Sequence, residues 1–205
     1  MVERYKCNKC GTVNEFPRYG NAMTLLKFRK GRCGEWANCF TLILKSLGLK
    51  VRYLWNLEDH VWCEYYSKNL KRFIHLDPCE NAFDNPLLYN HGWGKKMSYV
   101  FAISDHYIQD VSDRYVDSKS DKKLPRNRIS ELDLNKFLAI VNLTNFLRIK
   151  DTNDYLETVS EFLNDYNQRK GITKLAHSKT PLSTEMLPRQ SGSADWTKSR
   201  GEDGK

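Results

Sequence analysis

The sequence lacks an apolar run long enough to cross a lipid bilayer, and its first seven residues, MVERYKC, lack the hydrophobic stretch of a secretory signal. We therefore expect a cytoplasmic protein that does not insert into membranes. Basic residues exceed acidic ones, giving a net charge of +8, but no arginine–aromatic recognition motif is present. Because charge alone permits only weak association with polyanions, the sequence predicts no nucleic-acid partner.

Cysteine is limited to six residues, and only Cys7 and Cys10 form a Cys-x-x-Cys pair. Without an export signal, these thiols are expected to be reduced and used for metal binding or catalysis rather than for disulfides. Two thiolates followed by Gly11 are typical of a zinc knuckle, so the pair predicts half of a four-ligand structural zinc site. A redox pair is the alternative, but the residues that follow do not resemble the start of a helix, which favours zinc.

One cysteine stands between two glycines in the segment Gly31–Asn38, GRCGEWAN. The downstream apolar residues recur at helical spacing and predict a helix over about 34–47: Trp36, Phe40, Ile43 and Leu47. Gly48 follows at the position typical of a helix C-terminus. Cys33 then lies at the helix N-terminus, where the helix dipole favours a thiolate. The alternative is a cysteine that only packs in the core.

Three strands are predicted next, over 49–55, 60–66 and 71–77, with a turn at 67–70. If that turn has four residues, counting outward places His60 opposite Asp77 on one face of the sheet. The two-residue period also places Trp62 and Glu64 on the His60 face. His75 shares the Asp77 face and is the second candidate for a catalytic base.

The remainder of the chain predicts an α+β fold with helices following the sheet. We expect an irregular loop over 81–97, strands over 98–103 and 107–111, and a charged connection over 117–128. Ser130 and Asp133 resemble a helix-capping box, and a further helix is expected over about 151–170, ended by Gly171. Residues 172–205 are polar and are expected to be disordered.

A cysteine at a helix N-terminus, a histidine on a strand and an aspartate on the paired strand have the roles of a cysteine-nucleophile triad. In this interpretation the Cys33 thiolate attacks an acyl carbon and His60 transfers the proton. Asp77 accepts a hydrogen bond from the far ring nitrogen and fixes the tautomer. The alternative is that two polar core residues and a packing thiol share one region.

Three segments carry a resemblance to a known family: GRCGEWAN (31–38), DHVW (59–62) and HLDPCE (75–80). They resemble the cytosolic peptide:N-glycanases of the transglutaminase-like superfamily, and the similarity covers roughly residues 1–116. The resemblance implies a transglutaminase-like (papain-like) core, in which a cysteine-bearing helix packs on an antiparallel sheet. It places the catalytic triad on Cys33, His60 and Asp77. It also implies glycan contacts by Arg52, Trp62 and Glu64, and assigns Cys7 and Cys10 to the second of two zinc knuckles.

The resemblance also divides the chain. Residues 1–30 hold the half zinc knuckle, 31–116 the catalytic core, and 117–171 a charged linker with helices that pack on the core. The tail, 172–205, contains a segment, 191–196 (SGSADW), that is similar to the opening of the family's C-terminal glycan-binding domain. The first zinc knuckle and most of that domain have no counterpart here, which suggests a fragment, an alternative product or an incomplete gene model.

The family's activity is an amidase that removes N-linked glycans from misfolded glycoproteins and converts the asparagine to aspartate. The resemblance further implies structural zinc and partnership with the proteasome shuttle factor and the segregase ATPase. Two other hypotheses remain open. One is a protease or transglutaminase with the same triad. The other is an inactive or weakly active isoform that binds glycoproteins or degradation partners.

Overall fold

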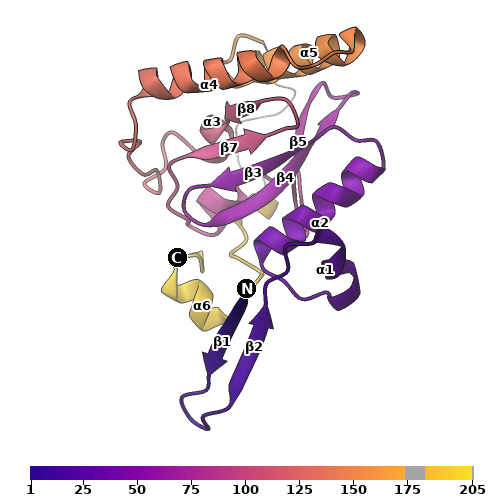
Figure 1. Cartoon of the computed structure of the whole chain (residues 1–205). Coiled ribbons are helices and arrows are strands. Elements are labelled where there is room, and N and C mark those ends of the chain that lie inside the picture. The colour runs from indigo at the N-terminus through magenta and orange to yellow at the C-terminus, as the bar shows by residue number, and fades with distance from the viewer. Residues whose placement is uncertain (174–182, 205) are drawn as a thin grey trace.

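A six-stranded antiparallel sheet forms the centre of the protein, seen in a computed structural model that describes residues 1–173 and 183–204 (Figure 1). The spatial strand order is β6-β5-β4-β3-β7-β8. Three long neighbouring strands were predicted, and they are β3 (Val51–Asn56), β4 (His60–Ser67) and β5 (Arg72–Asp77). The shorter strands are β6 (Ala82–Phe83), β7 (Val100–Ile103) and β8 (Ile108–Asp110).

The register of β4 and β5 differs by two residues from the prediction. Tyr66 pairs with Phe73 rather than with Lys71, because the turn falls one residue later at each end. Continuing this ladder places Asp77 level with Trp62, so Asp77 is a diagonal neighbour of His60 rather than its direct partner. A shift of two residues keeps every side chain on its face, so His60 and Asp77 still lie on one face.

Helix α2 (Cys33–Ser46) packs against β3 and β4 (Figure 1). Its C-terminus follows the prediction, since the C-cap is Leu47 and Gly48 adopts a φ of 75°, a conformation that glycine adopts without strain. The predicted packing face is partly right. Phe40 packs on the core, but Leu47 is 70% exposed, and the buried apolar residues of α2 are Ala37, Cys39 and Leu44.

Helices α4 (Glu131–Phe146) and α5 (Thr152–Arg169) run along the side of the sheet opposite the chain's N-terminal hairpin (Figure 1). The Ser130 hydroxyl accepts the Asp133 amide at 3.1 Å, which confirms the predicted N-cap, and Lys170 with Gly171 ends α5. Tyr115 ends the short helix α3 (Ser112–Tyr115), and π-helical η1 (Leu88–Gly92) lies within the predicted 81–97 loop.

The N-terminal elements were not predicted. A two-stranded hairpin, β1 (Val2–Lys6) and β2 (Val13–Pro17), projects from the body, and helix α1 (Ala22–Phe28) packs on α2 (Figure 1). Arg18 joins the hairpin to α2 by pairing with Glu3 at 2.7 Å and Glu35 at 2.6 Å. These ion pairs attach the exposed hairpin to α2. The sequence of the hairpin shows no apolar periodicity that would have predicted this contact.

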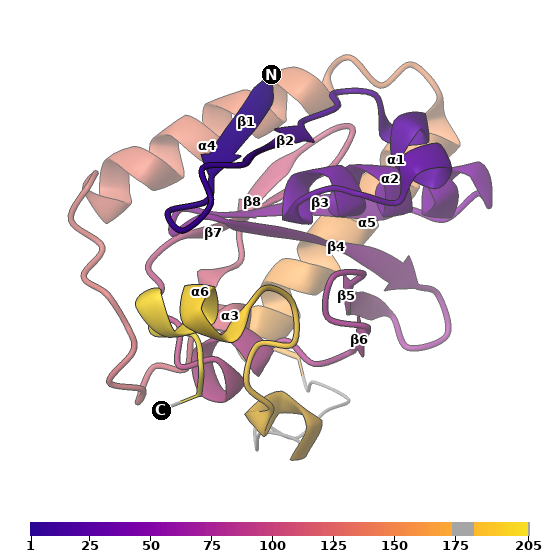
Figure 2. The same ribbon diagram turned by 90° about the horizontal axis from the view of Figure 1, so that it is seen from below.

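The C-terminal segment 183–204 differs from the expected disorder. It forms η2 (Ser183–Met186) and α6 (Ala194–Ser199) and lies below the sheet in the view of Figure 2. Buried charges hold it there, because Lys95 and Arg189 both pair with the buried Glu202. Residues 174–182 and 205 of the predicted tail lie outside the described residues.

Candidate active site

Cys33 is the first residue of α2 and is partly buried. The preceding turn is closed by a capping interaction, in which the Arg32 amide donates to Glu35 Oε2 at 2.8 Å. Gly31 has no room for a side chain, because an added Cβ would lie 2.7 Å from Glu35 Cβ. The segment GRCGE therefore sets the Cys33 thiol at a helix N-terminus, where free amides and the helix dipole favour an anion.

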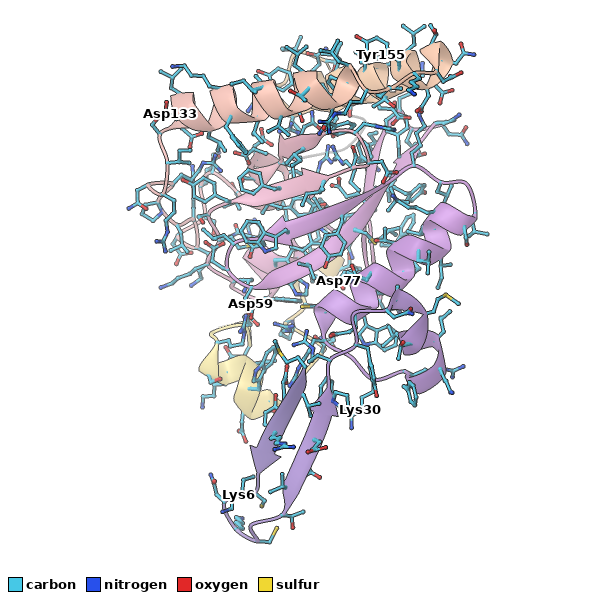
Figure 3. All side chains as sticks on the ribbon, in the orientation of Figure 1. Lys6, Lys30, Asp59, Asp77, Asp133 and Tyr155 are labelled. Carbon is cyan, nitrogen blue, oxygen red and sulfur yellow. The ribbon has the colours of Figure 1, made fainter. Side chains whose placement is uncertain are left out.

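His60 begins β4 and Asp77, labelled in Figure 3, ends β5, and the structure brings the two side chains together at the ends of these neighbouring strands. The His60 Nε2 atom lies 2.8 Å from Asp77 Oδ2, and both side chains are fully buried. The Asp77 Oδ1 atom accepts the Cys79 amide at 2.8 Å. Because Nε2 is bonded to Asp77, Nδ1 is the ring nitrogen left to interact with Cys33, and it has no hydrogen-bond partner among the described residues.

The electrostatics of the site favour a thiolate–imidazolium pair. Burial opposes ionisation of Cys33, but its interactions with His60 and the Val61 amide outweigh burial, and the pKa of Cys33 lies below its ordinary value. Burial also opposes protonation of His60, yet the charge of Asp77 and the bond to it raise the pKa of His60 to about 9. The pKa of Asp77 is lowered despite its burial, chiefly by His60. The three groups therefore have the charges that a cysteine hydrolase requires.

Two buried residues that sequence reasoning did not identify contact this pair. Tyr89 of η1 donates its hydroxyl to Asp77 Oδ2 at 2.9 Å, and Trp93 lies edge-on to the His60 ring with centroids 4.9 Å apart. Both are fully buried. The aromatic content of 81–97 was the available signal, but its turn residues predicted only an irregular loop. These rings exclude water from the far side of His60 and strengthen its bond to Asp77.

His75 is differently placed from His60. Its Nδ1 accepts the Asn85 amide at 3.2 Å and its Nε2 lies 2.7 Å from the Tyr89 hydroxyl. Burial lowers the pKa of His75 to about 4, so it is neutral at physiological pH. With both ring nitrogens occupied by other groups, His75 does not compete with His60 for Cys33.

The three predicted glycan-contacting residues lie inside the protein. Arg52, Trp62 and Glu64 are each at most 1% exposed. Trp62 stacks on His60 with centroids 5.6 Å apart, and Arg52 is paired with Glu64 directly across β3 and β4. Contact with a glycan stays a prediction for these residues, and it requires their present partners to move.

Arg52 and Glu64 belong to a buried ionic network that the sequence did not reveal. Asp165 of α5 accepts from Arg52 at 3.1 Å and from Arg169 at 3.0 Å, and it also pairs with Arg114. Arg114 in turn donates to Glu64 at 2.9 Å. Burial opposes ionisation of both acids, but the arginines outweigh it, lowering the pKa of Glu64 to about 2 and that of Asp165 further. This network fixes α5 to the catalytic sheet.

Cys7 and Cys10 lie at the exposed tip of the β1–β2 hairpin, next to Lys6 and far from Asp77 (Figure 3). The turn closes through the Gly11 amide bonding Cys7 O at 2.9 Å, and Gly11 has a φ of 72°. Hydrogen bonds from Thr12 and Cys7 lower the pKa of Cys10 to about 7, which suits a metal-binding thiolate. Within the described ranges 1–173 and 183–204, no third His, Cys, Asp or Glu joins them in a metal-binding group. They fit half of a tetrahedral zinc site.

The C-terminal segment closes one side of the site. Arg189 lies over the Trp93 ring, 4.4 Å from its centroid, and Arg200 donates to Asp59 beside His60 at 3.2 Å. Glu80, three residues beyond Asp77, accepts the Gln190 amide at 2.7 Å. The similarity of 191–196 to a glycan-binding domain stays a prediction, and this segment lies beside the His60–Asp77 pair.

The site combines a thiol at a helix N-terminus with a histidine–carboxylate pair on an antiparallel sheet, the group types that cysteine hydrolases use. The family model described as the Rad4 transglutaminase-like domain matches residues 56–179, and the model of the transglutaminase-like superfamily matches residues 1–78. The chain therefore belongs to the transglutaminase-like superfamily. Within the described residues, no helix is both long and apolar enough to span a membrane.

Three similar curated proteins share the name peptide-N(4)-(N-acetyl-beta-glucosaminyl)asparagine amidase. The chain is 50% identical to that of Kluyveromyces lactis over 206 residues, with 99% of this chain and 56% of the relative aligned. It is 47% identical to that of Saccharomyces cerevisiae over 209 residues, covering 100% and 56%. It is also 41% identical to that of Gallus gallus over 206 residues, covering 99% and 30%. The chain thus spans about half of the yeast relatives' length.

Proposed function

We propose that this chain hydrolyses the amide bond between an asparagine side chain and the first N-acetylglucosamine of an N-linked glycan. The observation that carries the proposal is the buried His60–Asp77 pair, 2.8 Å apart, set against the partly buried thiol of Cys33. Such a site activates a thiolate for attack on an acyl carbon, and the amidase name of the relatives selects the acyl group.

The first step forms a thioester. The Cys33 sulfur attacks the side-chain carbonyl carbon of the glycosylated asparagine, and the carbon–nitrogen bond to the sugar breaks. The glycosylamine leaves with a proton donated by the His60 imidazolium. Since the pKa of His60 is raised to about 9, the proton is available at neutral pH.

The second step releases the peptide. A water molecule gives a proton to the now neutral His60 and attacks the thioester carbon. The carbon–sulfur bond breaks, the Cys33 thiolate returns, and the asparagine has become an aspartate. Asp77 holds the imidazole by Nε2 throughout and stabilises its charged form, without itself taking a proton.

The biological setting follows the family resemblance and is proposed with it. The substrates are misfolded N-glycoproteins in the cytoplasm that are committed to degradation, and the partners are the proteasome shuttle factor and the segregase ATPase. We further propose that Cys7 and Cys10 supply two of the four ligands of a structural zinc ion. Two additional donors must come from residues outside the described set, since none there completes the site.

The test is to incubate the chain with a denatured N-glycopeptide and to analyse the peptide by mass spectrometry. The expected products are a free glycan and a peptide in which the asparagine has become aspartate. Cys33→Ala serves as the inactive control. Release of the glycan with the asparagine unchanged, cleavage of the peptide backbone, or transfer of an added amine to a glutamine would each contradict the amidase proposal.

A further inference from the structure

A chain of four hydrogen bonds leads from a backbone amide to the proposed catalytic histidine. The Asn85 amide donates to His75 Nδ1 at 3.2 Å, and His75 Nε2 lies 2.7 Å from the Tyr89 oxygen. The Tyr89 hydroxyl donates to Asp77 Oδ2 at 2.9 Å, and Asp77 Oδ2 also lies 2.8 Å from His60 Nε2. The four side chains are at most 2% exposed, so water does not compete for these bonds.

The direction of each bond is fixed by the first donor. A backbone amide cannot lose its proton, so His75 Nδ1 must be the unprotonated nitrogen and Nε2 must carry the hydrogen. His75 then donates to Tyr89, and the single Tyr89 proton is left to point at Asp77. A second backbone bond, from the Asp84 amide to His75 O at 2.7 Å, holds the Asn85 segment against β5. The opposite tautomer of His75 would turn the Tyr89 proton away from the carboxylate.

We propose that His75 and Tyr89 are positioning residues that hold and partly neutralise the Asp77 carboxylate, and thereby set the charge that His60 meets. This inference deepens the proposed function and relies on the same triad. Without the Tyr89 hydroxyl, Asp77 Oδ2 keeps one donor, His60, and presents more negative charge to it. The imidazolium is then held more strongly, while the carboxylate is free to rotate.

The measurement is the pH dependence of Cys33 alkylation by iodoacetamide, followed by mass spectrometry of the peptide that contains Cys33. Thiolate reactivity rises as Cys33 ionises beside the imidazolium and changes again as His60 loses its proton, near pH 9 in the unmodified chain. Other titratable groups lie around Cys33, His60 and Asp77 and come from several elements. They are Asp59, His75, Cys79, Glu80, Tyr89 and Arg189.

Tyr89→Phe keeps the ring, which packs 4.4 Å from Trp62, and removes only the hydroxyl. We expect the upper inflection of the alkylation profile to move to higher pH. We also expect glycan release to fall by about 10- to 100-fold, the range for a lost hydrogen bond to a charged group. Tyr99→Phe is the matched control, because Tyr99 is equally buried and its hydroxyl has no partner among the described residues.

His75 is tested by a pair of variants. His75→Gln retains a donor toward Tyr89 and should keep the upper inflection in place, whereas His75→Leu lacks that donor and should move it in the direction of Tyr89→Phe. Identical profiles for the two variants would exclude a role for His75 in directing Tyr89. An unmoved inflection in Tyr89→Phe, matching Tyr99→Phe, would show that Tyr89 only packs and would overturn the proposal.

The alkylation profile also separates this proposal from the amidase proposal. If the unmodified chain shows both inflections and Tyr89→Phe moves the upper one, the positioning chain is supported even when no glycan is released. If the unmodified chain releases glycan and Tyr89→Phe leaves the alkylation profile unchanged, the amidase proposal is supported and the positioning role of Tyr89 is rejected.

Discussion

Lys95 and Glu202 form a buried ion pair, with Nζ 2.6 Å from Oε1, although 107 positions separate them in the chain. Burial lowers the pKa of Lys95, while its pairing lowers the pKa of Glu202 to about 2 despite burial. Glu202 also pairs with Arg189 and Arg200. Glu202 therefore joins the C-terminal segment to Lys95 of the body, beside the bonds that Glu80 makes to the same segment.

Glu202→Gln is expected to detach that segment. The substitution leaves the buried Lys95 without an anion. Removing one partner of a buried ion pair lowers the free energy of unfolding by roughly 3–5 kcal/mol. We expect faster hydrogen exchange over 188–204 and a lower melting temperature, and Asp203→Asn on the same segment serves as the control. Unchanged exchange in Glu202→Gln would show that other contacts hold the segment.

Cys33→Ala should abolish glycan release without unfolding the protein. Members of a catalytic triad act as a unit, so we expect a loss of about 10⁴- to 10⁶-fold. Cys39→Ala removes a thiol from the same helix and should retain activity, because Cys39 packs in the interior. Glycan release by Cys33→Ala at a rate near that of the unmodified chain would reject the nucleophile.

Glycan release should decline above about pH 9, where the His60 imidazolium loses the proton that the leaving amine needs. The same shift affects stability. The folded-state pKa of His60 exceeds the unfolded value of about 6.5, so its stabilising contribution is complete below that value and disappears as the pH rises through about 9. Activity and melting temperature measured from pH 6 to 10 test both statements. A rate that rises steadily to pH 10 would contradict the role of the imidazolium.

Asp165→Asn is expected to destabilise the protein by roughly 3–5 kcal/mol, because it leaves Arg52, Arg114 and Arg169 with fewer buried anions. Denaturant unfolding measures the difference. Asp105→Asn breaks an exposed pair with Lys45 and should cost less than about 1 kcal/mol. Equal losses in the two variants would show that the buried network does not fix α5.

The 205-residue chain should hold zinc weakly, since two thiolates at an exposed hairpin tip leave half of the coordination sphere unfilled. A chelator is expected to move its melting temperature by less than about 2 °C, which corresponds to less than about 1 kcal/mol for a chain of this size. Metal analysis after gel filtration completes the test. One tightly bound zinc ion per chain, with a large drop on chelation, would show that further ligands were missed.

The strands and the His60–Asp77 contact could be predicted because they depend on a two-residue period. Strand alternation identified β3, β4 and β5, and an error of two residues in the register left the two side chains on the same face. An error of one residue would have separated them. Cys33 was predictable because glycines and a helical pattern marked the start of α2.

Helix α5 was predicted in extent, but not in which of its residues face the sheet. Leu156 is 59% exposed, whereas the buried positions include Glu161 and Asp165. Their partners outside α5 are Lys50, Arg52 and Arg114, and one-dimensional periodicity carries no information about such distant charges. The C-terminal segment was missed for the same reason, since Glu202 becomes interior only through Lys95 and two arginines.

The ionic network also constrains the order in which the chain can fold. Arg52 and Asp165 are 113 positions apart, so their contact closes a long loop. During synthesis β3, β4 and α3 leave the ribosome well before α5. Until Asp165 arrives, Arg52 and Arg114 share one carboxylate, that of Glu64, and the incomplete sheet carries uncompensated positive charge. Docking of α5 is therefore expected to be a late step in folding, because only α5 supplies the second carboxylate for these two arginines.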